Sequence, residues 1–179
     1  MYTRRSMLTM VTIVLSVGLL QVQLARAKDI FILTGDRITN ANNSRETIRL
    51  GERLPVIALK KRFAKYKVRS TFHEDCNVCA YISRGKVGFS VDYGETGIII
   101  AGITCDTGCA DALGNTIGTS LRQAVGSQAN CDAGDVITCK SRIFGLSYIV
   151  YGNQRCRLMV EEQKETSIPS CARIEGFKI

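Results

Sequence analysis

Apolar and polar residues alternate in the middle of the chain, and a short aliphatic run follows. Residues 87–92 have the sequence Val-Gly-Phe-Ser-Val-Asp, in which every second position from Val87 is apolar, as in a strand with one buried face. Residues 98–104 are mostly aliphatic and predict a buried strand. Residues 93–97 between them contain two glycines and predict a hairpin loop.

The segment after this second strand has the spacing of a helix. Asp106 or Thr107 can cap its start, and Gly126 can end it. Internal glycines weaken the helix, each by about 1 kcal/mol relative to alanine. The pattern predicts one main helix over residues 106–125. Five residues spaced four apart form its apolar face: Cys109, Leu113, Ile117, Leu121 and Val125.

Further apolar runs predict strands toward the C-terminus. Residues 144–151 and 155–162 predict an antiparallel pair that turns at Gly152-Asn153, and residues 173–177 predict a short last strand. This order of elements predicts an α+β fold in which one main helix packs on an antiparallel sheet. The predicted domain covers residues 63–179 and is small enough to need staples in addition to its core.

The N-terminus has the three parts of a signal peptide. Arg4 and Arg5 precede an apolar run over residues 7–20, and Ala25-Arg26-Ala27 is a small-x-small cleavage site. A membrane anchor is the alternative, but a spanning helix needs roughly 20 apolar residues, more than this run supplies. We predict a signal peptide over residues 1–27, cleavage after Ala27, and no integral membrane segment in the mature form.

The segment that follows is free of cysteine and ends in a dibasic pair. Residues 28–62 end in Lys60-Lys61-Arg62, and Phe63 follows. A Kex-type protease cuts after Lys-Arg, so we predict a pro-peptide over residues 28–62 with Lys61 and Arg62 as its processing site. The alternative is an exposed basic turn that is never cleaved. Asn42-Asn43-Ser44 is a glycosylation sequon, which predicts a glycan on Asn42 in a eukaryotic producer.

The chain has eight cysteines, all after the proposed pro-peptide. An even number in an exported protein predicts four disulfides, in one of 105 pairings. Cys76-x-x-Cys79 also has the spacing of a zinc site or of a redox motif, but thiols in an oxidising compartment usually become cystines. We therefore predict no metal. The cysteines are Cys76, Cys79, Cys105, Cys109, Cys131, Cys139, Cys156 and Cys171.

The formal net charge of +8 suggests an anionic partner, but the charge is unevenly distributed. Residues 1–62 contain eleven Lys or Arg and four Asp or Glu, whereas residues 63–179 contain thirteen and twelve. Processing would therefore remove most of the basic character, and we expect no nucleic-acid partner. The remaining basic cluster, Lys65, Lys67 and Arg69, is typical of a solvated arm; an arm that contacts anions or lipids is the alternative.

Catalytic motifs are absent, and no cofactor is expected. The chain has one histidine, His73, in a polar run, which excludes a two-histidine ribonuclease, and it has no Gly-x-Ser-x-Gly elbow. Asp132-Ala133-Gly134-Asp135 lacks the alternating oxygen ligands of a calcium loop. Hydrolysis by paired carboxylates stays open, with these candidates: Asp92, Glu95, Asp106, Asp111, Asp132, Asp135, Glu161 and Glu162.

A signal ending at Ala27, a cysteine-free segment closing at Lys60-Lys61-Arg62 and an eight-cysteine domain together resemble the fungal secreted cysteine-rich effectors and killer-toxin-like proteins. The resemblance implies a disulfide-tied helix-on-sheet sandwich that binds a host or competitor protein or cell-surface component without catalysis. We expect a secreted, extracellular monomer whose specificity lies on loops 93–97 and 127–135. The alternative is a small secreted, glycosidase-like hydrolase with paired carboxylates.

Overall fold

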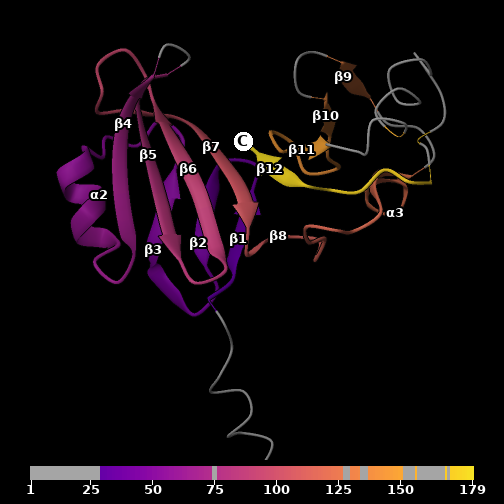
Figure 1. Cartoon of the computed structure of the whole chain (residues 1–179), viewed down its shortest axis with the longest axis horizontal. Helices are drawn as coiled ribbons and strands as arrows, with labels where there is room; N and C mark the ends of the chain where they lie inside the picture. The colour runs from indigo at the N-terminus through magenta and orange to yellow at the C-terminus, as the bar shows by residue number, and fades with distance from the viewer. Residues whose placement is uncertain are drawn as a thin grey trace, which may run out of the picture.

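The computed structural model describes residues 29–73, 76–126, 130–133, 137–150, 156, 168 and 170–179. These residues form two sheets, one of four strands in the order β3-β2-β1-β8 and one of eight in the order β4-β5-β6-β7-β12-β11-β10-β9 (Figure 1). The elements are β1 (Phe31–Thr34), β2 (Arg37–Asn40), β3 (Asn43–Arg49), α2 (Val56–Arg62), β4 (Lys67–His73), β5 (Cys76–Arg84), β6 (Val87–Tyr93), β7 (Ile100–Thr107), β8 (Cys109–Asp111), α3 (Leu121–Val125), β9 (Cys131–Ala133), β10 (Ile137–Lys140), β11 (Ser147–Val150) and β12 (Gly176–Lys178).

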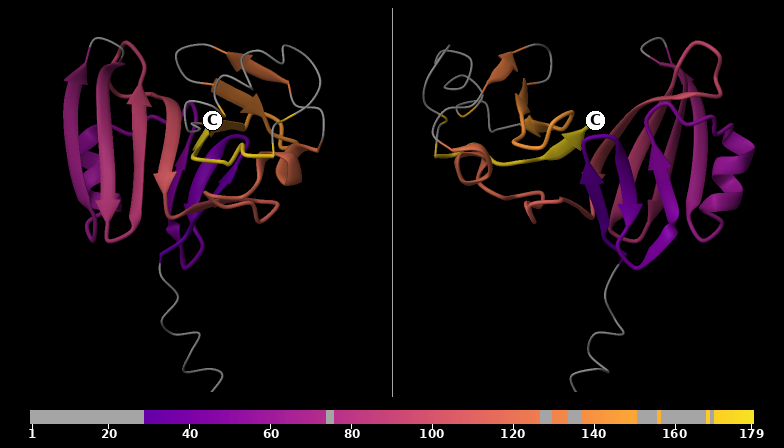
Figure 2. Two further views of the ribbon diagram at one scale, coloured as in Figure 1. Left: turned by 45° about the vertical axis from the view of Figure 1, so that its right-hand side comes forward. Right: turned by 180° about the vertical axis from the view of Figure 1, so that it is seen from behind.

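The strands β4 to β7 form an antiparallel meander whose inner face packs against β1–β3 and α2, as Figures 1 and 2 show. Alternate residues of β6 point into this interface, because successive side chains of a strand lie on opposite faces. Phe89 of β6 contacts Phe31 of β1 with ring centroids 4.9 Å apart, and Phe63, directly after α2, at 5.7 Å. All three rings are fully buried. This aromatic cluster joins the two layers.

The predicted strands around the first hairpin are confirmed. Residues 87–92 fall in β6, and the aliphatic run 98–104 overlaps β7, which pairs with β6 in antiparallel register. Residues 147–150 of the predicted strand 144–151 form β11, and the last strand is found at Gly176–Lys178. The segment 155–162, predicted to pair with 144–151, lies outside the described residues, as does the turn at Gly152-Asn153.

The predicted helix over residues 106–125 is wrong, and with it the α+β fold class with one main helix. Asp106 and Thr107 end strand β7, residues 109–111 form β8, and only Leu121–Val125 is helical. Gly108, Gly114 and Gly118 have φ of +71°, +85° and +89°, in the left-handed region that a right-handed helix cannot contain. The molecule is mostly β, with two sheets and minor helices.

The cysteine-free segment contributes one half of the sandwich. Residues 31–49 form β1–β3, and residues 56–62 form α2. Phe31, Leu33, Ile38, Ile48 and Leu59 are each fully buried in the core. β1 also pairs in parallel with β8, which lies beyond the proposed cut. Cleavage after Arg62 stays a prediction, but the segment is part of the folded core.

Three disulfides are described, and they bear out the cysteine-rich, disulfide-bonded character of the chain. They are Cys105–Cys109, Cys131–Cys139 and Cys156–Cys171, and Cys79 is disulfide-bonded too. Cys105 lies on β7 of the larger sheet and Cys109 on β8 of the smaller one, so this bond joins the two sheets. Because no helix starts at residue 106, this disulfide ties strand to strand and does not connect a helix to the sheet. Cys131–Cys139 joins the paired strands β9 and β10.

Within the described part of the chain, no helix has both the length and the apolar character to cross a membrane. The proposed signal peptide, residues 1–27, lies outside that part.

Candidate functional site

A groove of about 930 Å³ lies at one end of the sandwich, where three segments distant in sequence meet. Asp29 and Ile30 lie directly before β1, Arg84–Val87 form the β5–β6 turn and its flanks, and Thr107 and Gly108 connect β7 to β8. Ile117 completes the lining. We call this feature the sandwich-end groove. Its surface is mainly apolar, with Ile30, Val87 and Ile117 as the aliphatic residues, and its charged groups are Asp29, Arg84 and Lys86.

Two glycines shape the groove. Gly85 has a φ of +59°, which closes the turn between β5 and β6. Gly108 lets the β7–β8 link approach β6: a Cβ at Gly108 would lie 2.9 Å from the backbone of Val87, closer than carbon atoms pack. The Gly108 carbonyl accepts a hydrogen bond of 3.1 Å from the Phe31 amide. The groove wall is therefore fixed backbone.

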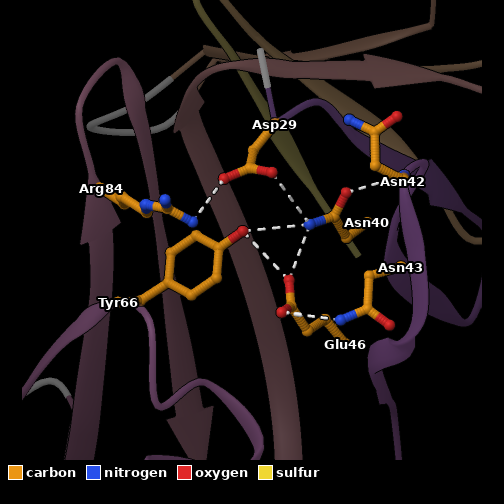
Figure 3. Close-up of polar contacts among 7 residues, drawn as sticks. All are labelled: Asp29, Asn40, Asn42, Asn43, Glu46, Tyr66 and Arg84. Carbon is orange, nitrogen blue, oxygen red and sulfur yellow. Dashed lines mark hydrogen bonds and ion pairs between the residues drawn. The ribbon is translucent and has the colours of Figure 1, made fainter. Parts of the chain in front are cut away.

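A polar cluster lies beside the groove and connects it to the core (Figure 3). Asp29 forms an ion pair with the Arg84 guanidinium, with a nitrogen–oxygen distance of 3.2 Å. The Asn40 side-chain amide donates to Glu46 at 2.7 Å and to Tyr66 Oη at 3.0 Å, which occupies its two hydrogens. The Asn40 side chain also contacts the Asp29 carboxylate, at 3.5 Å. This is longer than the 3.2 Å ion pair with Arg84, which is therefore the main partner of Asp29.

Glu46 is the centre of this polar cluster. It is 5% exposed and accepts hydrogen bonds from Asn40, from Tyr66 at 3.1 Å, and from Asn43 at 2.8 Å. Burial, together with the hydrogen bond to the Glu46 carboxylate, raises the pKa of Tyr66 well above its ordinary value. Tyr66 therefore stays a neutral donor. These bonds tie the β2–β3 hairpin to the segment before β4 and indicate a structural role.

The charges at the groove are not equally available to a ligand. Arg84 is paired with Asp29, and its guanidinium lies over the Tyr66 ring, 5.7 Å from the centroid. Lys86 is exposed, and within the described part of the chain no acidic side chain lies at ion-pair distance from it. The groove thus offers an aliphatic wall and one cation to a partner.

A second buried polar cluster surrounds Asp111. Its carboxylate accepts hydrogen bonds from Tyr148 Oη at 2.6 Å and from the side chain and backbone of Asn115, at 2.8 and 2.9 Å. Burial and the hydrogen bond to Asp111 raise the pKa of Tyr148 to about 12. Asp111 is 1% exposed, so this candidate carboxylate connects β8 to β11 and faces no cleft.

Asp92 and Asp106 are the candidate carboxylates with a perturbed pKa. Partial desolvation raises the pKa of both carboxyls, and for Asp92 the charge of Lys178 partly offsets the effect; the Asp106 side chain remains exposed at the end of β7. Asp92 is opposite Gly102, four residues before Asp106 on β7, which separates the two acids by about 13 Å along the strand. Glycosidase carboxylates lie about 5 to 9.5 Å apart.

The other carboxylate and metal candidates are dispersed. Glu95 and Asp132 are exposed, on the β6–β7 loop and on β9, and Asp135, Glu161 and Glu162 lie outside the described residues. Gly134, in the run weighed as a calcium loop, lies outside them too. No three His, Cys, Asp or Glu side chains among the described residues could hold a metal ion together.

The structure also locates the modification and processing residues. Asn42 is exposed in the β2–β3 turn, where its backbone N–H donates to Asn40 Oδ1 at 2.9 Å. Lys61 is exposed on α2, whereas Arg62 donates to the Thr47 carbonyl and to Glu52, each at 2.6 Å. Glycosylation and cleavage stay predictions.

The basic cluster has regular structure. Lys67 and Arg69 lie on strand β4, and Lys65 is in the turn before it, so the prediction of a solvated arm is wrong in its conformation. Of the two loops expected to carry specificity, 93–97 joins β6 and β7, while residues 127–129 and 134–136 of the other lie outside the described residues.

Sequence reasoning missed the sandwich-end groove. Its residues span positions 29 to 117 and carry no common motif. The one local signal was Arg84-Gly85-Lys86, a glycine between two cations after an alternating stretch, which is a hairpin signature with charge at its tip.

No known protein family matches this chain, and neither a curated protein nor a solved structure is significantly similar to it.

Proposed function

We propose that the chain is exported and acts by binding a host or competitor component in the manner of a secreted effector or toxin. The observation that carries this proposal is the sandwich-end groove, a concave and mainly apolar surface with the exposed Lys86 among its lining residues. Pockets of this kind bind ligands by apolar burial, and a few polar groups orient the ligand. The described disulfides fit a protein that works in an oxidising compartment.

The groove favours a partner group with an apolar body and a negative charge. Ile30, Val87 and Ile117 would contact the apolar body, and Lys86 would meet the charge.

Carboxylate hydrolysis is the second candidate function, and the raised pKa values of Asp92 and Asp106 favour it. Two observations make it weaker than binding. The pair lies too far apart along β6 and β7 for either glycosidase geometry. Desolvation also shifts both pKa values in the same direction, whereas an acid and a base need environments that separate them.

The groove can be tested with anilinonaphthalene sulfonate, a fluorescent probe that has an apolar body and one negative charge. We expect the native protein to bind it, and Ile30→Asp and Lys86→Glu each to weaken binding at least fivefold. Ile57→Asp and Lys60→Glu make the same changes on the exposed side of α2 and serve as matched controls. Equal binding by all four variants would contradict the proposal. Near-ultraviolet circular dichroism verifies that each variant is folded.

Export can be tested separately. The intact mass of the protein collected from the medium, before and after reduction, reports the N-terminus, the state of the Arg62–Phe63 bond and the number of cystines. A mass that retains residues 1–27, or eight free thiols, would contradict a secreted, disulfide-bonded form.

A further inference from the structure

Strand β4 forms one edge of the eight-stranded sheet. It pairs with β5, and among the described residues no other backbone hydrogen bond joins it to a strand or loop. The edge runs over seven residues, Lys67–His73, with regular register from Lys67 to Thr71. An open edge of this length presents a row of unused amide and carbonyl groups, which is a template for a further strand.

The other sheet edges of the described chain are shorter or covered by side chains. On β3, the Thr47 carbonyl accepts from Arg62, the Ser44 carbonyl accepts from the Thr47 hydroxyl, and the Arg49 amide donates to Glu52. β8 and β9 have three residues each. β4 is therefore longer than β8 and β9, and unlike β3 it has no side chain bonded to its backbone in the described part of the chain.

The two faces of β4 differ in chemistry. Lys67, Arg69 and Thr71 pair with Ser83, Tyr81 and Cys79 on the outer face of the sheet, and both cations are exposed. Val68 and Ser70 pair with the buried Ile82 and Ala80 and carry no charge. Phe72 follows at the bulge and is 79% exposed. A strand beside β4 would thus meet cations on one face and uncharged side chains on the other.

We propose that β4 binds an extended acidic segment of a partner protein as an added antiparallel strand. Main-chain hydrogen bonds would supply affinity, as in other cases of strand addition. Acidic residues at every second position would lie beside Lys67 and Arg69, and the apolar residues between them would lie beside Val68 and Phe72. The recognised pattern is therefore alternating acidic and apolar residues over about six positions.

The charges on β4 disfavour a second copy of this chain as the occupant. Antiparallel pairing of two β4 strands would place Lys67 and Arg69 of one copy near the same cations of the other, which is destabilising. Charged edge strands often serve only to prevent association. Here the cations occupy one face and Phe72 remains exposed, so the edge repels itself and still accepts an acidic strand. This surface includes no residue of the sandwich-end groove, and each proposal can fail without the other.

The test uses the full disulfide-bonded chain and a fluorescent, end-blocked hexapeptide in which glutamate and valine alternate. We expect a saturable rise in anisotropy. The isomer with three glutamates followed by three valines, and an alternating lysine–valine peptide, should each bind at least tenfold more weakly. Two further versions of the glutamate–valine peptide carry N-methyl groups, one on the odd and one on the even backbone nitrogens. One version should lose binding and the other should keep it, because only every second N–H of an added strand points toward β4.

Variants locate the site. Arg69→Glu should weaken the glutamate–valine peptide at least tenfold and improve binding of the lysine–valine peptide, whereas Arg122→Glu, the same change on the exposed surface of α3, should alter neither. Peptide binding should also slow amide hydrogen exchange within residues 67–71. Equal binding of the two glutamate–valine isomers, an unaffected Arg69→Glu variant, or a dimer in sedimentation that Arg69→Glu alters would each overturn the proposal.

Discussion

A few polar side chains are buried in this core, and hydrogen bonds satisfy their donors and acceptors. Asn40, Glu46 and Asp111 are buried polar residues of the described chain, and each has hydrogen-bond partners. Glu46 depends on Tyr66 in particular, because the tyrosine hydroxyl donates to the carboxylate and accepts from Asn40. Loss of that one oxygen leaves two buried groups short of a partner.

We predict that Tyr66→Phe lowers the free energy of unfolding by about 1 to 3 kcal/mol, the cost of an unsatisfied buried polar group. Urea denaturation monitored by circular dichroism measures it. Tyr81→Phe is the matched control, since Tyr81 is 41% exposed and should change stability by less than about 0.5 kcal/mol. A similar loss in both variants would mean that the Glu46 cluster contributes nothing specific.

Asp92 gives a residue-scale prediction on pH. Burial raises its pKa in the folded state above the ordinary 3.8. The native state therefore binds more protons than the unfolded state between the ordinary and the raised pKa, and stability falls as pH rises through that interval. We expect Asp92→Asn to be more stable than the wild type at pH 7 and nearly equal to it at pH 3.

Thermal unfolding at the two pH values measures this difference. Asp132→Asn makes the same change at an exposed position and should leave the wild-type pH dependence in place. An Asp92→Asn variant that is less stable than the wild type at pH 7 would show that the contact with Lys178 outweighs burial.

At the scale of elements, α2 determines how accessible the proposed processing site is. The Arg62 side chain is held by Glu52 and by the Thr47 carbonyl, and the Phe63 amide donates to the Leu59 carbonyl at 2.9 Å. Phe63 is fully buried. Because a protease binds its substrate as an extended segment, the end of α2 must unwind before the bond is cut.

We therefore predict that a Lys-Arg-specific protease cuts the folded protein after Arg62 far more slowly than the protein in urea. Glu52→Gln removes the charge that holds Arg62 and should speed native cleavage several-fold. Mass spectrometry of timed digests gives the rates, with Asp36→Asn, on the β1–β2 turn, as the control. Equal rates with and without denaturant would show that the α2 end is already open in the native state.

For the whole molecule, the disulfides stabilise by limiting the unfolded chain, more so when they close longer loops. Cys156–Cys171 spans 15 residues and Cys105–Cys109 spans 4. Loop-closure entropy predicts that removing them costs about 3 and about 2 kcal/mol, respectively.

Double alanine variants and denaturant unfolding test this order. The buried Cys105–Cys109 bond also joins the two sheets. If its loss costs more than that of Cys156–Cys171, contacts in the folded state outweigh the entropy of the unfolded chain.

The sequence by itself determined the features that depend on neighbouring residues. The alternation in residues 87–92 and the glycines of 93–97 predicted β6 and the loop to β7, because strand period and turn geometry are local properties. The cysteine content predicted a disulfide-bonded domain. The helix failed because i+4 spacing records only which residues are apolar. It does not show that Gly108, Gly114 and Gly118 adopt positive φ, or that Gly108 packs directly against the backbone of Lys86 and Val87.

Only the tertiary structure decided the role of residues 29–62 and the location of the candidate sites. The strands β2 and β3 have one apolar residue each, Ile38 and Ile48. With β1 they form a sheet that is held in the core by long-range contacts with β8, Phe63 and Phe89. The sandwich-end groove and the open edge of β4 follow from the order of strands in the sheets. Strand order depends on the total burial and hydrogen bonding of the assembled core, which no short stretch of sequence encodes.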